Sequence, residues 1–171
     1  DLNSLWQLKK GKKILGEFNL APNLSRVDAK PGKFLYSSPL LDNRFGFKGH
    51  FDLFEFDTRS KKSKRLSVDQ RYYHPQYSPN GKYIAVTAMT EDDQFEIRIL
   101  KGKKIVKRIK PKKKYEVYSE AIWSSNDELI LIKIDIEGKR SIVHYFIKSE
   151  DEIELTPPTR ANLYSLHYAD E

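Results

Sequence analysis

Short apolar runs separated by polar turns follow one another along the whole chain. Residues 73–88 read YHPQYSPNGKYIAVTA, in which Ser-Pro-Asn-Gly separates two runs that favour strands. Asn-Gly is a strong hairpin signal because both residues tolerate positive φ, and Pro79 presets the turn. The apolar residues are consecutive or alternating rather than three and four apart, so the pattern predicts strands and not helices.

The hairpin recurs at a regular distance. A shift of 46 residues places YSPNGKYIAV on WSSNDELILI, so that Tyr77 meets Trp123 and Ile84 meets Ile130. A second hairpin follows each of these, and its apolar runs at 5–8, 53–56, 97–100 and 143–146 lie 48, 44 and 46 residues apart. Four short strands in each repeat of this length are typical of propeller blades. The sequence therefore predicts an all-β fold, a β-propeller of four-stranded antiparallel blades.

The repeat divides the 171 residues unevenly. We expect a half blade at 4–18, blades at 24–67, 72–110 and 118–156, and the first strand of a next blade at 162–171. Because propellers typically have four to eight blades, we expect these three to four blades to be part of a larger propeller. A ring of four blades closed by pairing the two ends is the alternative. Open blade edges would expose unpaired backbone groups, which favours assembly with another chain.

Residues 77–86, YSPNGKYIAV, resemble the WD40-like PD40 repeat of TolB-type propellers. The family pattern is an aromatic residue, Ser, Pro, Asp, Gly and Lys, followed by an apolar strand. Asn80 stands where the family usually has Asp, and the second copy has Ser125 for Pro and Asp127 for Gly. The resemblance implies a TolB-like propeller in the bacterial envelope or periplasm, with which a chain that starts at Asp1 agrees. It says little about function, because such propellers serve many roles.

Composition narrows the classes of protein further. Hydrophobic residues make up 39% of the chain, which is enough for a packed core, and there is no cysteine for disulfide or thiol chemistry. No apolar run approaches the ~18 residues of a membrane span. The net charge of +7 is local, since residues 101–114 hold nine Lys or Arg and no acid, and the remainder carries −2.

The sequence contains none of the common catalytic motifs. It has no Gly-x-Ser-x-Gly elbow, no His-Glu-x-x-His and no P-loop, so we expect neither an enzyme nor a bound cofactor. The four histidines, which occupy different places in the repeat, are interpreted as surface or strand residues and not as metal ligands: His50, His74, His144 and His167.

Two further patterns have structural interpretations. Asp135 and Glu137 lie two apart, on the same face of an extended chain, and are interpreted as a solvated strand end. Tyr77 and Trp123 hold the same position in the repeat, which predicts packing between blades rather than ligand stacking.

The candidate contact surface combines two loops that a propeller places on one face. The loop at 38–50 mixes arginine and aromatic residues with polar ones, a composition enriched at interface hot spots. The connection at 110–117 adds lysines. The predicted partner-binding residues are Asp42, Asn43, Arg44, Phe45, Phe47, Lys112, Lys113 and Lys114.

The sequence thus predicts a non-catalytic scaffold that presents loops 38–50, 89–94 and 110–117 to a partner protein. One alternative is the gating propeller of a prolyl-oligopeptidase-like serine peptidase, whose hydrolase domain would lie elsewhere in the gene. Another is binding of nucleic acid or an anionic surface through residues 101–114. Nucleic acid is disfavoured because residues 101–104 fall on a turn at the opposite face from residues 110–114, so the run does not form one patch.

Overall fold

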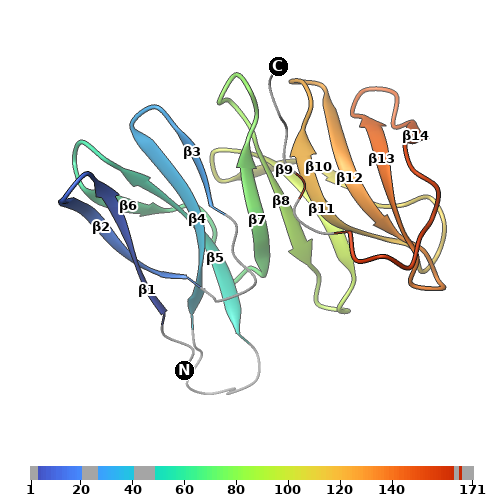
Figure 1. Ribbon diagram of the computed structural model, residues 1–171, viewed down its shortest axis with the longest axis horizontal. Helices are drawn as coiled ribbons and strands as arrows, with labels where there is room; N and C mark the ends of the chain where they lie inside the picture. The colour runs from blue at the N-terminus through green and yellow to red at the C-terminus, as the bar shows by residue number, and fades with distance from the viewer. Residues whose placement is uncertain (1–3, 21–26, 41–48, 164–165, 167–171) are drawn as a thin grey trace. The chain divides into compact units, whose positions relative to one another are not determined.

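Strands account for all the regular secondary structure in the residues that the structure describes. This computed structural model describes residues 4–20, 27–40, 49–163 and 166. One two-stranded and three four-stranded sheets are present (Figure 1), and strands that follow one another in the chain are neighbours in each sheet. The predicted all-β class is confirmed.

The strands of each sheet are short. The two-stranded sheet consists of β1 (Ser4–Lys10) and β2 (Lys13–Leu20). The three four-stranded sheets consist of β3 (Asp28–Lys30), β4 (Lys33–Leu40), β5 (His50–Asp57) and β6 (Lys62–Arg65); β7 (Tyr72–Tyr77), β8 (Ile84–Met89), β9 (Phe95–Lys101) and β10 (Lys104–Ile109); and β11 (Val117–Trp123), β12 (Glu128–Ile134), β13 (Arg140–Phe146) and β14 (Glu152–Glu154). The chain divides into two compact units, residues 1–75 and 76–171.

Aromatic rings form the core of the first unit. Phe18, Tyr36 and Phe56 are buried where β2 packs against the sheet of β3–β6. The ring centroid of Phe18 lies 4.8 Å from that of Tyr36 and 5.0 Å from that of Phe56. Such tilted contacts between rings add to the stabilisation from burial.

Gly16 on β2 lets these rings approach the backbone. A Cβ atom at this position would lie 2.7 Å from the ring of Phe18 and 2.8 Å from the ring of Phe56. Both distances are far below van der Waals contact, so the packing requires a residue without a side chain.

An aliphatic and aromatic core joins the two sheets of the second unit, where β11 packs against β8 and β9. Tyr77 and Trp123 are both buried, at 7% and 6% exposure, which supports the prediction that they are packing residues. Gln76 ties the sheets together, because its carbonyl accepts from the Trp123 indole N–H at 3.2 Å and its side chain from the Trp123 backbone N–H at 2.8 Å.

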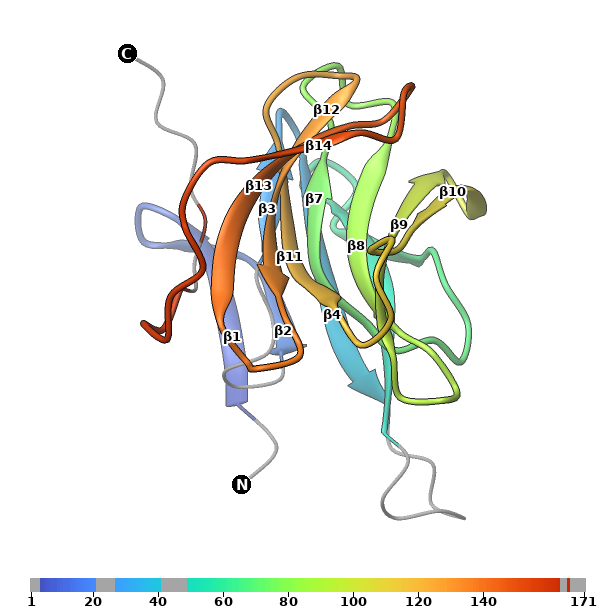
Figure 2. The same ribbon diagram turned by 90° about the vertical axis from the view of Figure 1, so that its right-hand side faces the viewer.

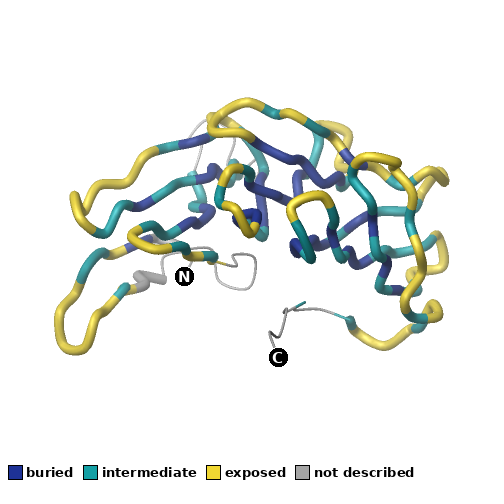
Figure 3. Tube along the Cα trace, turned by 90° about the horizontal axis from the view of Figure 1, so that it is seen from above, coloured by how far each residue is buried: buried dark blue, intermediate teal, exposed yellow. Residues whose placement is uncertain are grey.

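The two repeated turns, β7–β8 and β11–β12, lie at the same end of these strands (Figure 2). Gly81 in the first turn adopts φ 66°, as Asn-Gly predicts. Asn126 of the second turn accepts a hydrogen bond from the backbone N–H of Asn80 at 3.0 Å, so the two equivalent asparagines join the turns. Exposed residues are concentrated at such turns, whereas the strands contain the buried ones (Figure 3).

The predicted equivalence of Ile84 with Ile130 is wrong by one residue. The backbone hydrogen bond that closes the first turn joins residues 78 and 83, whereas the bond that closes the second joins residues 124 and 128. The second turn is one residue shorter, so Ile84 corresponds to Leu129. Side chains alternate along a strand, so this single residue decides which face is buried. Leu129 is 0% exposed and Ile130 is half-buried.

A fully buried carboxylate holds the outer strand of the sheet β3–β6. Asp52 on β5 is 0% exposed. Arg65 donates to it from Nη2 and, at 3.1 Å, from Nε, and the hydroxyl of Ser67 donates at 2.7 Å. The backbone N–H groups of Asp69 and Gln70 donate at 3.2 and 3.1 Å. Because a buried charge needs this degree of pairing, Asp52 fixes both β6 and the segment that follows it.

A second buried carboxylate, Glu96 on β9, is 1% exposed. Arg98 donates to it at 2.5 Å and Arg108 on β10 at 2.9 Å, and the Lys110 ammonium lies 3.2 Å from its other oxygen. Burial alone would raise the pKa of Glu96, but the contacts with Arg98 and the other two cations outweigh burial and hold the pKa below its ordinary value.

The two arrangements are the same clamp in successive repeats. On β6, Arg65 pairs with Phe54, two residues after Asp52. On β10, Arg108 pairs with Arg98, two residues after Glu96. The pairs Asp52–Arg65 and Glu96–Arg108 therefore occupy one place in the repeat. In the third sheet Ser141 takes the place of the acid, so the ionic clamp is specific to two of the three sheets.

Substitution of Asp52 by Asn should lower the free energy of unfolding by about 3 kcal/mol, because the amide nitrogen of Asn cannot accept the hydrogen bonds that one buried Asp52 oxygen accepts. Urea unfolding followed by circular dichroism measures the loss. The matched control is Asp69→Asn, whose carboxylate is 72% exposed and 3.6 Å from the same arginine. It should cost less than about 1 kcal/mol. Equal losses in the two variants would contradict the clamp.

Substitution of Glu96 by Gln should change how stability depends on pH. The folded pKa lies below the ordinary value of 4.5. The stabilisation that ionised Glu96 provides is therefore fully present above about pH 4.5, and it is lost as the pH falls through the lower pKa of the folded state. Wild type should exceed the variant by about 3 kcal/mol at pH 7, and the gap should narrow in acid. Unfolding curves at pH 7, 5 and 3 test this, and a gap that is constant with pH would refute it.

Candidate protein-binding face

The predicted loop at 38–50 is shorter than expected. Strand β4 continues to Leu40 and β5 begins at His50, and residues 38–40 pair with residues 50–52 in the ladder. The strands extend further because this pairing satisfies backbone groups that the sequence pattern assigned to a loop. The remaining predicted contact residues of this loop lie outside the described residues: Asp42, Asn43, Arg44, Phe45 and Phe47.

Three connections lie at one end of the sheets in the second unit, and we call them the connection face. They are the β8–β9 loop at 90–94, the β10–β11 connection at 110–116 and the β12–β13 turn at 135–139. Figure 2 shows all three at the opposite end from the β7–β8 and β11–β12 turns. The antiparallel order of the strands places them together, as the sequence predicted for 89–94 and 110–117.

The predicted residues Lys112, Lys113 and Lys114 are exposed on this face. The Lys112 ammonium lies 3.7 Å from Asp151, and the Lys113 ammonium 3.8 Å from Glu116. The Lys114 ammonium lies 4.8 Å from the ring centroid of Tyr115, within the range of a cation–π contact. All three cations therefore project into solvent, and such exposed contacts hold them only weakly.

A partly buried polar cluster fixes the start of β11 beside this connection. The Lys133 ammonium lies 2.7 Å from Glu152 and 3.8 Å from Glu116, and Tyr118 donates its phenolic proton to Glu152. Burial would lower the pKa of Lys133, but Glu152 outweighs it and raises that pKa. Burial and the neighbouring Glu152 raise the pKa of Tyr118 well above its ordinary value. The cluster keeps its charges at neutral pH and anchors the connection to its sheet.

Tyr145 lies beside this cluster and contacts Tyr118 edge to face, with 6.3 Å between the ring centroids. Burial first, and then the charges of Glu150, Glu152 and Asp151, raise the pKa of Tyr145 to about 12. Sequence reasoning identified none of these residues. The one available signal was the acidic run 150–154, which has the charge needed to pair with the basic run 101–114.

Carboxylates lie close to several cations of the basic stretch 101–114. Lys107 pairs with Glu150 at 2.6 Å, and Arg108 and Lys110 both pair with Glu96. With Lys112 and Lys113, five of the nine cations thus have an acid within 4 Å. Residues 101–104 form the β9–β10 turn at the far end of β10, so the stretch is divided between two ends of the sheet. This geometry argues against a continuous phosphate-binding patch.

One trio of side chains has the composition of a hydrolytic triad but not its geometry. The Nε2 atom of His144 lies 3.4 Å from the Ser124 hydroxyl and 3.1 Å from Glu128. A triad needs the serine and the acid on different imidazole nitrogens, so that one orients the ring while the other takes the proton. Here both contact the same nitrogen, and the ring cannot relay a proton between them.

Asp135, another polar residue that the sequence analysis considered, has a structural role. Asp135 accepts the backbone N–H groups of Glu137 and Lys139, both at 2.9 Å, and so shapes the β12–β13 turn. Within the described ranges, no three histidine or acidic side chains gather as a metal site requires. His167 lies outside those ranges.

No helix in the described part of the chain has the length and apolar character to cross a membrane.

Solved structures show what the chain resembles. TolB from Acinetobacter baumannii matches 85% of this chain with a TM-score of 0.61 at 14% identity. A protein from Agrobacterium tumefaciens assigned as TolB matches 84% with a TM-score of 0.63 at 17% identity. The β-propeller domain of the Trilobed protease from Pyrococcus furiosus matches 77% with a TM-score of 0.56 at 15% identity. The fold is that of a β-propeller.

The four-stranded sheets are blades of this propeller, and the resemblance to TolB-type repeats is confirmed at the level of structure. The chain spans only part of these structures, namely 35%, 52% and 43% of their lengths. No protein-family model matches the sequence, and no curated protein matches it. At these identities the comparisons show the fold, and function has to be argued from the propeller's own residues.

The divided basic stretch leads to a prediction about nucleic acid. At about 0.15 M salt the propeller should show no saturable binding of a 20-base-pair DNA duplex, because most of its cations are paired or separated. Fluorescence anisotropy of labelled duplex between 50 and 200 mM salt measures this. Micromolar binding whose affinity falls steeply with salt would contradict the prediction and restore the nucleic-acid alternative.

Proposed function

We propose that this β-propeller is a non-catalytic scaffold that binds a partner protein through the connection face. The observation that carries the proposal is the exposure of Lys112, Lys113 and Lys114 on a connection whose far end is anchored by the cluster around Lys133. A surface that is preorganised in this way loses little conformational entropy on binding. The cations favour an acidic surface on the partner, since charge complementarity guides association and selects partners.

The resemblance to TolB supports an assembly in the bacterial envelope or periplasm as the setting. Fractionation of cells that express the native gene tests this setting directly. Recovery of the protein with the periplasmic or envelope fraction agrees with it, and recovery with cytosolic markers refutes it without affecting the binding proposal.

A capture experiment with charge-reversal variants tests the binding proposal. The immobilised propeller is incubated with the envelope fraction of its source organism. One variant carries Lys112→Glu, Lys113→Glu and Lys114→Glu. The matched control carries Lys101→Glu, Lys103→Glu and Lys104→Glu at the other end of the sheet, which changes net charge equally.

A partner of the connection face should be retained by the wild type and by the 101–104 control, and lost by the 112–114 variant at least about tenfold. Equal loss in both variants would mean attraction to overall charge and not to this face. Equal retention by all three would place binding elsewhere. Either outcome refutes the connection face as the binding surface.

The similarity to the propeller domain of the Trilobed protease favours one second candidate, the gating propeller of a serine peptidase. In that case a hydrolase domain with a nucleophile elbow belongs to the same polypeptide. The intact mass and sequence of the native protein decide between the two. A fused hydrolase domain whose peptidase activity rises when the propeller is removed would establish the peptidase role.

A further inference from the structure

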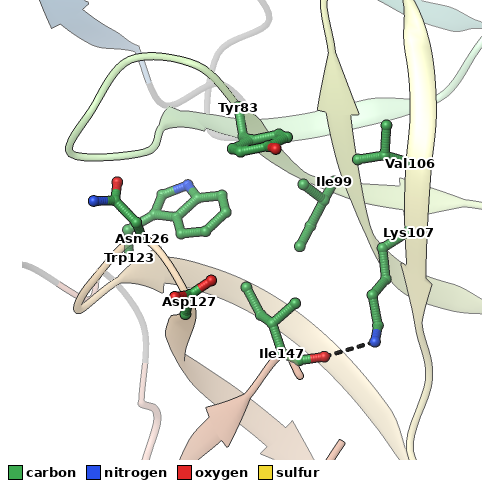
Figure 4. A pocket seen from close by; sticks show the side chains of 8 residues that line it. All are labelled: Tyr83, Ile99, Val106, Lys107, Trp123, Asn126, Asp127 and Ile147. Atoms are coloured by element: carbon green, nitrogen blue, oxygen red, sulfur yellow. Dashed lines mark hydrogen bonds between the residues drawn. The ribbon is translucent and has the colours of Figure 1, made fainter. Parts of the chain in front are cut away.

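A small pocket lies between the last two blades, beside the β7–β8 and β11–β12 turns. It encloses about 220 Å³. Its walls come from both blades, with Tyr83, Ile99 and Val106 on one side and Trp123 and Ile147 on the other (Figure 4). The ring of Trp123 lies between Tyr83 and Asp127 in this view. The interior surface is therefore mainly aromatic and aliphatic.

The charged groups at the rim are already paired within the chain. Lys107 donates to the carbonyl oxygen of Ile147 at 2.6 Å and lies 2.6 Å from Glu150. Asp127 pairs with Lys148 at 2.8 Å. One paired cation and one paired anion leave no net charge to attract an ionic ligand, and a charged occupant would have to break one of these contacts.

The neutral polar groups around the pocket also have partners. The Trp123 indole N–H donates to the carbonyl of Gln76, and the Asn126 side-chain oxygen accepts from Asn80. What the pocket offers to an occupant is thus the apolar faces of its rings and aliphatic side chains. Covering apolar surface of this kind with another apolar group lowers the free energy.

The outer strand beside the pocket is suited to a peptide. β10 is the edge strand of its sheet, in the order β10-β9-β8-β7. A bulge interrupts its ladder with β9, because Ile105 pairs with Leu100 and Lys107 with Ile99 while Val106 between them is unpaired. Val106 is 46% exposed although it is apolar. Bulges re-aim side chains beside sites, and an edge strand offers backbone groups to an added strand.

The pocket volume indicates the kind of occupant. Pockets for drug-sized molecules and cofactors enclose about 300–1,000 Å³. This pocket is smaller and is of the size that holds one large side chain. We propose that it binds a leucine-sized apolar side chain of an extended segment from a partner protein, which pairs with the edge of β10. This contact does not rest on the connection face and stands or falls separately.

Nuclear magnetic resonance with short peptides tests the proposal on the isotopically labelled full chain. The probes are the blocked peptides Thr-Thr-Leu-Thr-Thr and Thr-Thr-Lys-Thr-Thr, and free indole. The leucine peptide should shift the Trp123 indole signal and the amide signals of β10 saturably, with a dissociation constant of about 1 mM or below. A Trp6→Phe variant assigns the indole signal, since the chain has two tryptophans.

Val106→Glu should weaken binding of the leucine peptide about tenfold, because it places a charge at the apolar rim. The matched control is Ile136→Glu at the β12–β13 turn, where Ile136 is 73% exposed, and it should bind as the wild type does. If the amide spectrum of Val106→Glu shows loss of folding, Val106→Asn replaces it with the same expected direction.

Three results would overturn the proposal. The first is no saturable shift with the leucine peptide up to about 5 mM. The second is tighter binding of the lysine peptide, which would mean a cationic occupant. The third is a response of Trp123 to indole without any response of β10 to the peptide, which would mean a site for a free small molecule.

Discussion

Two buried carboxylates hold the outer strands of their blades, and the path of the chain depends on them. An outer strand has a neighbour on one side only, and β6 has three exposed residues out of four. Apolar burial therefore contributes little to its attachment. Asp52 supplies the attachment through Arg65, and through the backbone of residues 69 and 70 it also fixes the direction in which the chain leaves the blade. Loss of this buried acceptor leaves several donors without a partner and costs about 3 kcal/mol, a large share of a typical domain's stability.

The fold could be predicted because its signals are local. A turn such as Ser-Pro-Asn-Gly and the apolar runs beside it act within a few residues, and their repetition indicated the blades. The alignment of one repeat with the next could not be predicted to the residue. A turn that is one residue shorter leaves the hydrophobic pattern almost unchanged, and yet it places Leu129 in the core where the alignment placed Ile130. The clamps were missed for a related reason. Asp52 and Arg65 are 13 residues apart, and nothing marks one pair among 24 acids and 31 bases.

For the candidate sites too, the sequence predicts what depends on local residues and misses what depends on contacts between blades. Lys112, Lys113 and Lys114, which were predicted to bind a partner, are exposed because a run of lysines between strands has no core to enter. Their neighbours could not be predicted, since Asp151 is brought to Lys112 by the packing of two blades. Trp123 was interpreted as a packing residue, which its burial supports, but the sequence could not show that the same ring also lines a pocket. That pocket is made jointly by two repeats, so no single motif contains it.

Gly16 shows how closely the aromatic core of the first unit is fitted to its backbone. The rings of Phe18 and Phe56 occupy the volume where any other residue would place its first side-chain carbon. Substitutions at these three positions therefore depend on one another. A side chain at residue 16 would meet both rings, so it becomes compatible with this core only when both rings have moved or have been replaced by smaller groups.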